Sequence, residues 1–193
     1  MKRICVFCGS NRGMRSEYIE AAQSLGKILV ERNLSLVYGG GNVGLMGVIA
    51  DAVLAEGGEV IGVIPQSLVD REVAHQNLTK MHIVNSMHER KALMADLSDG
   101  FIAMPGGMGT FDEFCEILTW AQLGIHQKPC GILNVENYFT PLLKMFDHAR
   151  DEGFLRDTHR DLVMESTTPE TLLELFDNYQ PKPVVKWMGL DKV

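Results

Sequence analysis

The sequence lacks the features that mark membrane-spanning, secreted and metal-binding proteins. None of its apolar runs approaches membrane-spanning length, and no signal-peptide pattern precedes the first apolar stretch, which begins at Ile4. The six histidines are scattered, and no HExxH or comparable ligand spacing is present. We therefore expect a cytoplasmic protein without a membrane partner, a metal ion or another cofactor.

Positive charge is also in short supply. The 193 residues include 18 Lys and Arg against 25 Asp and Glu, which gives a formal net charge of −7. This balance disfavours a nucleic-acid polymer as partner, and with it a DNA-processing function, because binding a polyanion needs clustered Lys and Arg. It leaves room for a mononucleotide, since one phosphate needs only a local nest of donors.

Cysteines are few, and each lies inside an apolar segment typical of a core. They are Cys5, Cys8, Cys115 and Cys130. The Cys5-x-x-Cys8 spacing could also indicate a redox or metal site. Residues three apart on a strand face opposite sides of a sheet, however, so these two thiols should not converge. We expect all four to be core residues.

Apolar runs and helical patterns alternate along the chain. We expect strands at residues 3–8, 35–38, 59–64, 80–84, 100–104, 129–133 and 162–164. We expect helices at residues 16–32, 43–56, 87–97, 111–123, 138–152 and 169–178. This alternation predicts a Rossmann-like three-layer αβα sandwich with a mainly parallel sheet of about seven strands. One nucleotide-binding domain would span residues 1–180, and residues 181–193 would form a tail.

The most informative segment is FIAMPGGMGTFDEFCE, from Phe101 to Glu116. An apolar strand ends at Pro105, and a glycine-rich turn leads into a helix. Glycines let the backbone approach a ligand closely, and the free amides and dipole of a helix N-terminus attract anions. A simpler interpretation is a tight turn with no ligand, since one glycine-rich loop is weak evidence. We predict a phosphate site formed by Gly106, Gly107, Met108, Gly109 and Thr110.

A second glycine-rich loop, YGGGNVGLMG from Tyr38 to Gly47, follows the second predicted strand and offers Gly41 as a further ligand contact. It lacks the Lys-Ser/Thr pair of a Walker-A loop, which argues against an ATPase. It also departs from the GxGxxG fingerprint, which argues against a dehydrogenase. Both loops follow strands, at the edge where parallel sheets bind their ligands.

Four motifs in order resemble the LOG ("Lonely Guy") family. They are YGGGNVGLMG at 38–47, MHERK at 87–91, PGGMGTFDE at 105–113 and LTWAQLGIH at 118–126. Members of that family are phosphoribohydrolases, which cleave the N-glycosidic bond of cytokinin riboside 5′-monophosphates and release the base and ribose 5-phosphate. The resemblance implies this activity here, with AMP as a further substrate, and a homodimer.

The resemblance also implies that Arg90 and Glu113 are catalytic. A carboxylate suits the reaction, because it can stabilise an oxocarbenium-like state or deprotonate the attacking water. The residues themselves allow simpler interpretations. Thr110-x-x-Glu113 is a capping-box sequence, in which Glu113 would only cap its helix. Arg90 could lie on a solvated helix face.

Further substrate contacts are implied at positions outside the two loops. They are Ser10, Glu72, Met87, Lys91 and Thr119. Thr119 is equally well explained as a helix threonine packed against a neighbour. Glu89, within the MHERK motif, is explained as the capping partner of Ser86.

Two other functions compete with hydrolysis. A nucleotide sensor or carrier without turnover would explain the phosphate loop, but not the joint presence of Arg90 and Glu113. A lysine decarboxylase, which is the label that many similar sequences carry, needs a lysine Schiff base and an acidic partner for the cofactor ring nitrogen. Nothing in the sequence singles out that pair.

Overall fold

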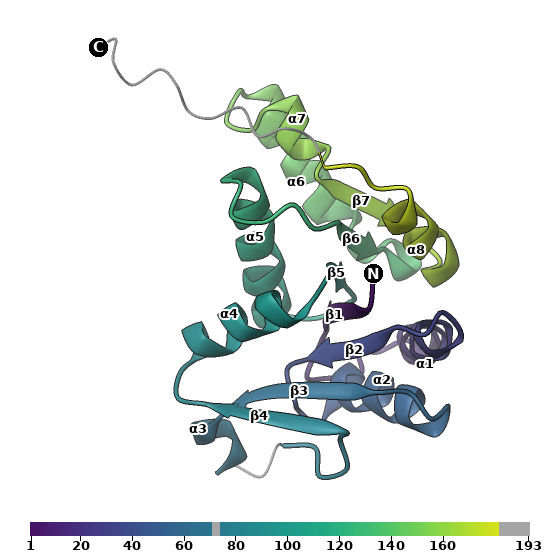
Figure 1. Ribbon diagram of the computed structural model, residues 1–193. Coiled ribbons are helices and arrows are strands. Elements are labelled where there is room, and N and C mark those ends of the chain that lie inside the picture. The colour runs from purple at the N-terminus through teal and green to yellow at the C-terminus, as the bar shows by residue number, and fades with distance from the viewer. Residues whose placement is uncertain (71–73, 182–193) are drawn as a thin grey trace.

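The computed structural model describes residues 1–70 and 74–181, which form one sheet covered by helices on both faces (Figure 1). The strands are β1 (Arg3–Phe7), β2 (Ser35–Tyr38), β3 (Val60–Pro65), β4 (Lys80–Val84), β5 (Gly100–Ala103), β6 (Cys130–Leu133) and β7 (Val163–Ser166). Their order is β4-β3-β2-β1-β5-β6-β7, and every neighbouring pair is parallel. The predicted αβα sandwich is confirmed, with all seven described strands parallel.

Two groups of longer helices cover the two faces of the sheet (Figure 1). One face carries α1 (Ser16–Glu31), α2 (Gly44–Ala55) and α8 (Pro169–Asp177). The other carries α4 (Met87–Leu97), α5 (Met108–Gln122) and α6 (Thr140–Asp151). Short helices lie in the connections: α3 (Gln66–Val69), η1 (Val135–Asn137) and α7 (Asp157–Arg160). None of the helices in the described ranges is long and apolar enough to cross a membrane.

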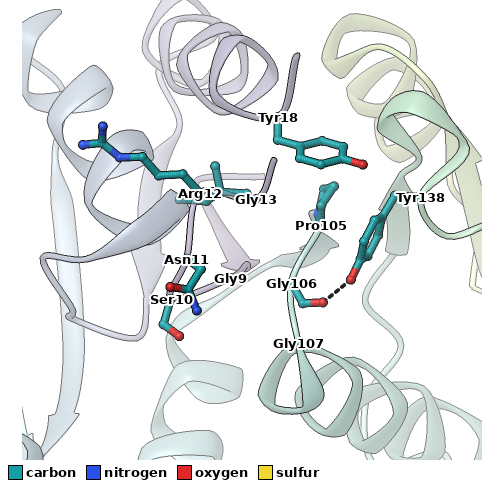
Figure 2. Close-up of a pocket in the computed structure, with 11 residues that line it drawn as sticks. Gly9, Ser10, Asn11, Arg12, Gly13, Tyr18, Pro105, Gly106, Gly107 and Tyr138 are labelled. Carbon is teal, nitrogen blue, oxygen red and sulfur yellow. Dashed lines mark hydrogen bonds between the residues drawn. The ribbon is translucent and has the colours of Figure 1, made fainter. Parts of the chain in front are cut away.

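The order of the strands reverses at β1, which lies between β2 and β5. The loop after β1 leads to α1 on one face, and the loop after β5 leads to α5 on the other. Figure 2 shows these loops, residues 9–13 and 105–107, side by side around a pocket. Ligands of open parallel sheets bind at such a reversal, beyond the carboxyl ends of the strands. The fold therefore brings the glycine-rich segments together where that rule requires.

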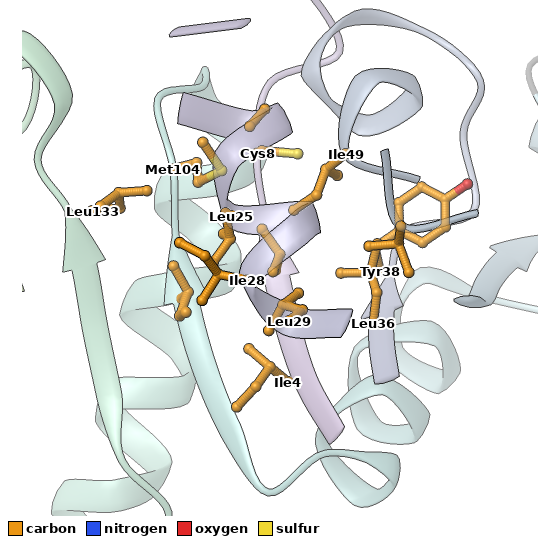
Figure 3. Packing of buried hydrophobic residues seen from close by; sticks show 14 of the residues in the cluster. Ile4, Cys8, Leu25, Ile28, Leu29, Leu36, Tyr38, Ile49, Met104 and Leu133 are labelled. Atoms are coloured by element: carbon orange, nitrogen blue, oxygen red, sulfur yellow. The ribbon is translucent and has the colours of Figure 1, made fainter. Parts of the chain in front are cut away.

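Each face of the sheet has its own core, because successive side chains of a strand point to opposite faces. Ile4 and Cys8 pack against Leu25 and Leu29 of α1 (Figure 3). Cys5 belongs to the opposite core, beneath α4 and α5. The prediction that the two thiols of Cys5-x-x-Cys8 do not converge is confirmed. Three of the cysteines are buried, while Cys115 is only half-buried, and none of the four forms a disulfide.

Two helix starts differ by two residues or more from the sequence prediction. Helix α5 begins at Met108, three residues before the predicted start, because glycines have low helix propensity and hid the first turn. The helix predicted from residue 138 begins at Thr140. Before it, Glu136 and Asn137 have φ angles of 52° and 59°, a left-handed conformation that interrupts the chain direction. Strand β7 also extends two residues beyond the predicted end at residue 164.

Candidate active site

The glycine loops pack directly on one another at the carboxyl edge of the sheet. The Gly9 amide donates to the Pro105 carbonyl at 3.0 Å, and the Gly9 carbonyl accepts from the Leu45 amide at 2.9 Å. A methyl group at Gly106 would lie 2.7 Å from the Gly9 nitrogen, and one at Gly44 would collide with the Ser10 backbone. Glycine is needed here because backbone meets backbone. These contacts hold three loops in one arrangement.

The loop after β5 leaves its helix N-terminus open to a ligand. The N-cap of α5 is Gly107, which has no side chain and therefore no oxygen that could cap the helix. A methyl group added at Gly107 or Gly109 would meet no atom within 4 Å. The first amides of a helix have no partner within the helix, and the dipole places partial positive charge there. This geometry fits an anion such as a phosphate.

A pocket of about 270 Å³ lies between this loop and the loop after β1 (Figure 2). Its walls are glycine-rich backbone, three polar side chains, two tyrosines, Leu45 and Pro105. The lining residues with polar or aromatic side chains are Ser10, Asn11, Arg12, Tyr18 and Tyr138. Ser10 was predicted from the sequence. The other four were missed, because nothing in the sequence links residues 11–18 to residue 138.

A buried ion pair joins helices α4 and α5. Arg90, from the first turn of α4, donates through Nη1 to Glu113 Oε1 of α5 at 2.7 Å. Each side chain is only 9% exposed. Arg90 Nε also donates to the Val63 carbonyl of β3 at 3.1 Å. Arg90 is therefore buried, and the interpretation of a solvated helix face is wrong.

The capping-box interpretation of Glu113 is also wrong. The N-cap of α5 is Gly107, so Thr110 is the third residue of the helix and does not occupy the N-cap position that a capping box requires. The Glu113 carboxylate accepts from Arg90 instead. The Ser86-x-x-Glu89 sequence does cap its helix: Ser86 Oγ accepts from the Glu89 amide at 3.1 Å, and Glu89 Oε2 accepts at 2.8 Å from the amide of Asn85, the residue before the N-cap. Two identical sequence signals thus have different structural meanings.

Burial and the paired charges change the pKa values of Glu113 and of the nearby Cys8 thiol. Burial raises the pKa of Glu113 above its ordinary value of 4.5, while the Arg90 guanidinium acts in the opposite direction. Burial, followed by the Glu113 carboxylate, also raises the pKa of the Cys8 thiol. A thiol kept protonated is a poor nucleophile.

Gly39, at the end of β2, makes room for the pair. A methyl group at this position would collide with the Arg90 guanidinium, whose Nη2 lies against the Gly39 backbone. The first glycine of the YGGG motif therefore makes room for the Arg90 guanidinium. The sequence could not show this, because the two residues are far apart in the chain. Gly41 forms a backbone bridge with Ala74.

The remaining predicted contacts do not form one cluster. Lys91 donates to Asp112 at 3.2 Å and lies 3.1 Å from Glu116, so it links α4 to α5. Met87 and Met108 are exposed. Thr119 donates to the Cys115 carbonyl of its own helix and lines a separate cavity with residues of α6, α7 and β7. The predicted contact Glu72 lies outside the described residues.

Among the described residues, no group of three or more His, Cys, Asp or Glu side chains could hold a metal ion. The structure brings two features together: the N-terminus of α5, which is open to an anion, and the buried ion pair between Arg90 of α4 and Glu113 of α5. Together with the reversed strand order, these features define a Rossmann-like protein with an anion-compatible helix N-terminus at its topological switch point.

Comparison with known proteins narrows the class to a family. Residues 46–176 match the family model described as possible lysine decarboxylase. The chain is 50% identical over 181 residues to the probable cytokinin riboside 5′-monophosphate phosphoribohydrolase LOGL2 of Oryza sativa subsp. japonica, covering 94% of this chain and 74% of that protein. It is 49% identical to the phosphoribohydrolase LOG3 of Arabidopsis thaliana, with 93% and 84% covered. The chain therefore belongs to the LOG family.

Solved structures with lower identity share the fold. A molybdenum cofactor binding protein from Rippkaea orientalis superposes with a TM-score of 0.70 at 22% identity, covering 92% of this chain and 97% of that one. The molybdenum cofactor carrier protein of Chlamydomonas reinhardtii superposes with a TM-score of 0.69 at 19% identity, with 92% and 96% covered. At such identity the likeness concerns the fold alone.

The contact between Gly39 and Arg90 gives a testable energetic coupling. We predict that Gly39→Ala lowers the free energy of unfolding by about 1–3 kcal/mol, because the added methyl group overpacks the guanidinium. In an Arg90→Ala background the same substitution should cost only a few tenths of a kcal/mol, since its partner is gone. Urea unfolding of the four proteins measures the coupling.

Gly107→Ala is the matched control, because its methyl group meets no atom within 4 Å. It should change stability equally little in both backgrounds. An equal loss from Gly39→Ala with and without the Arg90 side chain would contradict the contact.

Proposed function

We propose that this protein hydrolyses the N-glycosidic bond of cytokinin riboside 5′-monophosphates, and of AMP, to give the free base and ribose 5-phosphate. The observation that carries the proposal is the buried Arg90–Glu113 pair behind an open helix N-terminus. Relatives at about half identity are named as phosphoribohydrolases acting on cytokinin riboside 5′-monophosphates. A protein that only bound the nucleotide would need the anion site, but it would not need a buried carboxylate on the same helix.

The length of α5 between its N-terminus and Glu113 can be compared with the length of the substrate. A 5′-phosphate held by the amides at residues 107–110 sits at the start of the helix. Glu113 follows Met108 by five residues, or about 7–8 Å along the axis at ~1.5 Å per residue. That distance is comparable with the length of a ribose 5-phosphate, so the C1′ atom would approach the Glu113 carboxylate.

The proposed chemistry uses Glu113 as the base. The carboxylate takes a proton from water, the water oxygen bonds to C1′, and the C1′–N bond breaks with its electron pair leaving on the base, which takes up a proton. Positive charge that develops on the ribose ring faces a nearby anion. Arg90 fixes one carboxylate oxygen, and its charge opposes the rise in the Glu113 pKa that burial causes.

The decarboxylase activity in the description of the family model fits the site less well. A Schiff-base lysine needs an unprotonated amine. Lys91 is the lysine next to Arg90. Burial lowers its pKa, but the hydrogen bonds to Glu116 and Asp112 outweigh this and raise the pKa overall. Lys91 is thus held as an ammonium ion that links two helices.

Removal of the negative charge tests the role of Glu113. We expect Glu113→Gln to lower turnover by roughly 10²-fold or more, because the amide cannot accept the proton or stabilise positive charge. It should also lower stability, since the Arg90 charge loses its partner. Release of free base is measured by chromatography at a temperature where circular dichroism shows a folded protein.

Glu116→Gln is the matched control, because it removes the same charge from the same helix, where Glu116 pairs with Lys91. Its turnover should stay near that of the wild type. A folded Glu113→Gln protein with wild-type turnover would refute the catalytic role.

The pH dependence of turnover gives an independent prediction. The ionised carboxylate is the active form, and its pKa in the folded protein is raised above 4.5. Turnover should therefore be lost as the pH falls through this raised pKa, with a midpoint above 4.5. The profile is measured as kcat with saturating substrate, so that weaker substrate binding does not contribute. A midpoint at or below 4.5 would contradict the assignment.

We also propose that the protein is a symmetric homodimer, the commonest closed assembly. Large apolar side chains stay exposed near the ends of α5 and α6, including Leu123 (54%), Ile125 (64%) and Phe154 (88%). Exposed apolar groups of this kind mark interaction surfaces. Light scattering at micromolar concentration should give twice the chain mass of 21.5 kDa. A monomer would contradict the proposal.

A further inference from the structure

Tyr138 holds the phosphate loop from a distant part of the chain. Its hydroxyl donates to the Gly106 carbonyl, and the two residues are 32 positions apart (Figure 2). The ring is fixed by an edge-on contact with Tyr18, at 5.8 Å between centroids, and another with Phe139 at 5.1 Å. Tyr138 thus contacts the loop through one directed hydrogen bond from an immobilised ring.

This bond sets the orientation of a peptide group at the anion site. The described chain has no cis peptide bonds, so the Gly106 carbonyl and the Gly107 amide of one peptide unit point in opposite directions. With the carbonyl held towards Tyr138, the Gly107 N–H points away from it. Glycine on both sides would otherwise let this unit rotate readily. A flipped unit would direct the carbonyl oxygen, which carries partial negative charge, at the anion.

The chain adopts an unusual local conformation to deliver Tyr138. The two preceding residues, Glu136 and Asn137, are in the left-handed region although neither is glycine. The buried Asn134 side chain holds the turn: its Oδ1 accepts from the Phe139 amide at 2.7 Å, and its Nδ2 donates to Glu165 at 2.6 Å. Glu136 is paired with Arg15 of the loop before α1 at 2.8 Å. The turn is therefore fixed from several sides.

We propose that Tyr138 is a positioning residue, which locks the Gly106–Gly107 peptide so that the Gly107 N–H faces the substrate phosphate. The inference rests on the proposed function for the identity of the anion. It predicts an effect confined to phosphate recognition, because the hydroxyl acts on the loop and not on the Arg90–Glu113 pair.

The test is Tyr138→Phe, which keeps the ring contacts and removes the hydrogen bond. The KM for isopentenyladenosine 5′-monophosphate should rise about fivefold to tenfold, the effect of losing one hydrogen bond. The dissociation constant of ribose 5-phosphate, measured by calorimetry, should rise by the same factor. Hydrolysis of the riboside without phosphate, and kcat for the monophosphate, should stay near their wild-type values.

Tyr179→Phe is the matched control, because Tyr179 follows α8 near Cys130, at the amino end of the strands. It should change none of these quantities. An unchanged ribose 5-phosphate affinity in Tyr138→Phe, or an equal loss with riboside and monophosphate, would overturn the inference. If the wild type binds ribose 5-phosphate without hydrolysing nucleotides, the proposed function fails, and the binding measurement still decides the role of Tyr138. Failure of the wild type to bind ribose 5-phosphate overturns the inference, while release of free base decides the proposed function separately.

Discussion

The constraint on which this site depends is the burial of two opposite charges, Arg90 and Glu113, beneath the carboxyl edge of a parallel sheet. Removing a charge from water costs several kcal/mol, and leaving one partner alone in the interior typically costs about 3–5 kcal/mol. This cost is offset by the contact of 2.7 Å between Arg90 Nη1 and Glu113 Oε1 and by the hydrogen bond that Arg90 Nε donates to the Val63 carbonyl. A buried pair adds little net stability compared with apolar side chains, but removal of one partner alone is strongly destabilising.

Several features of the fold follow from that pair. Gly39 must lack a side chain because the guanidinium occupies its space. Helices α4 and α5 must stay in register, and Lys91 links them through Asp112 and Glu116. The helix that carries Glu113 begins at the glycine-rich turn after β5, so α5 itself sets the distance between its N-terminus and the carboxylate. The glycine loops after β1 and β2 pack behind it through direct backbone contacts.

The sequence was sufficient for the sheet and for the existence of the longer helices. Apolar runs mark five of the seven strands, whereas β4 (KMHIV) and β7 (VMES) also contain charged or polar residues. Alternation with helical patterns implies parallel pairing. The start of α5 was predicted too late, because three glycines obscure a first turn. Glu113 was ambiguous because a capping-box spacing and a buried ion pair share the same residues. Only the position of the N-cap, Gly107, separates the two interpretations.

Contacts between distant segments could not be predicted from one sequence. The bond from Tyr138 to Gly106 and the fit of Arg90 over Gly39 depend on which strands become neighbours. The position of Tyr138 further depends on the left-handed conformation of Glu136 and Asn137. Neither residue is glycine, so the sequence does not indicate this conformation. The resemblance to known motifs identified Arg90 and Glu113, while the structure gave the physical reasons for Gly39 and Tyr138.

Cleavage of a nucleotide between its base and its ribose is tested by incubating the wild-type protein with isopentenyladenosine 5′-monophosphate and quantifying every product by chromatography and mass spectrometry. A phosphoribohydrolase should release isopentenyladenine and ribose 5-phosphate in equal amounts, with no riboside and no inorganic phosphate. Riboside with inorganic phosphate would instead indicate a phosphatase, and intact bound nucleotide would indicate a carrier; either result would rule out the proposed hydrolysis.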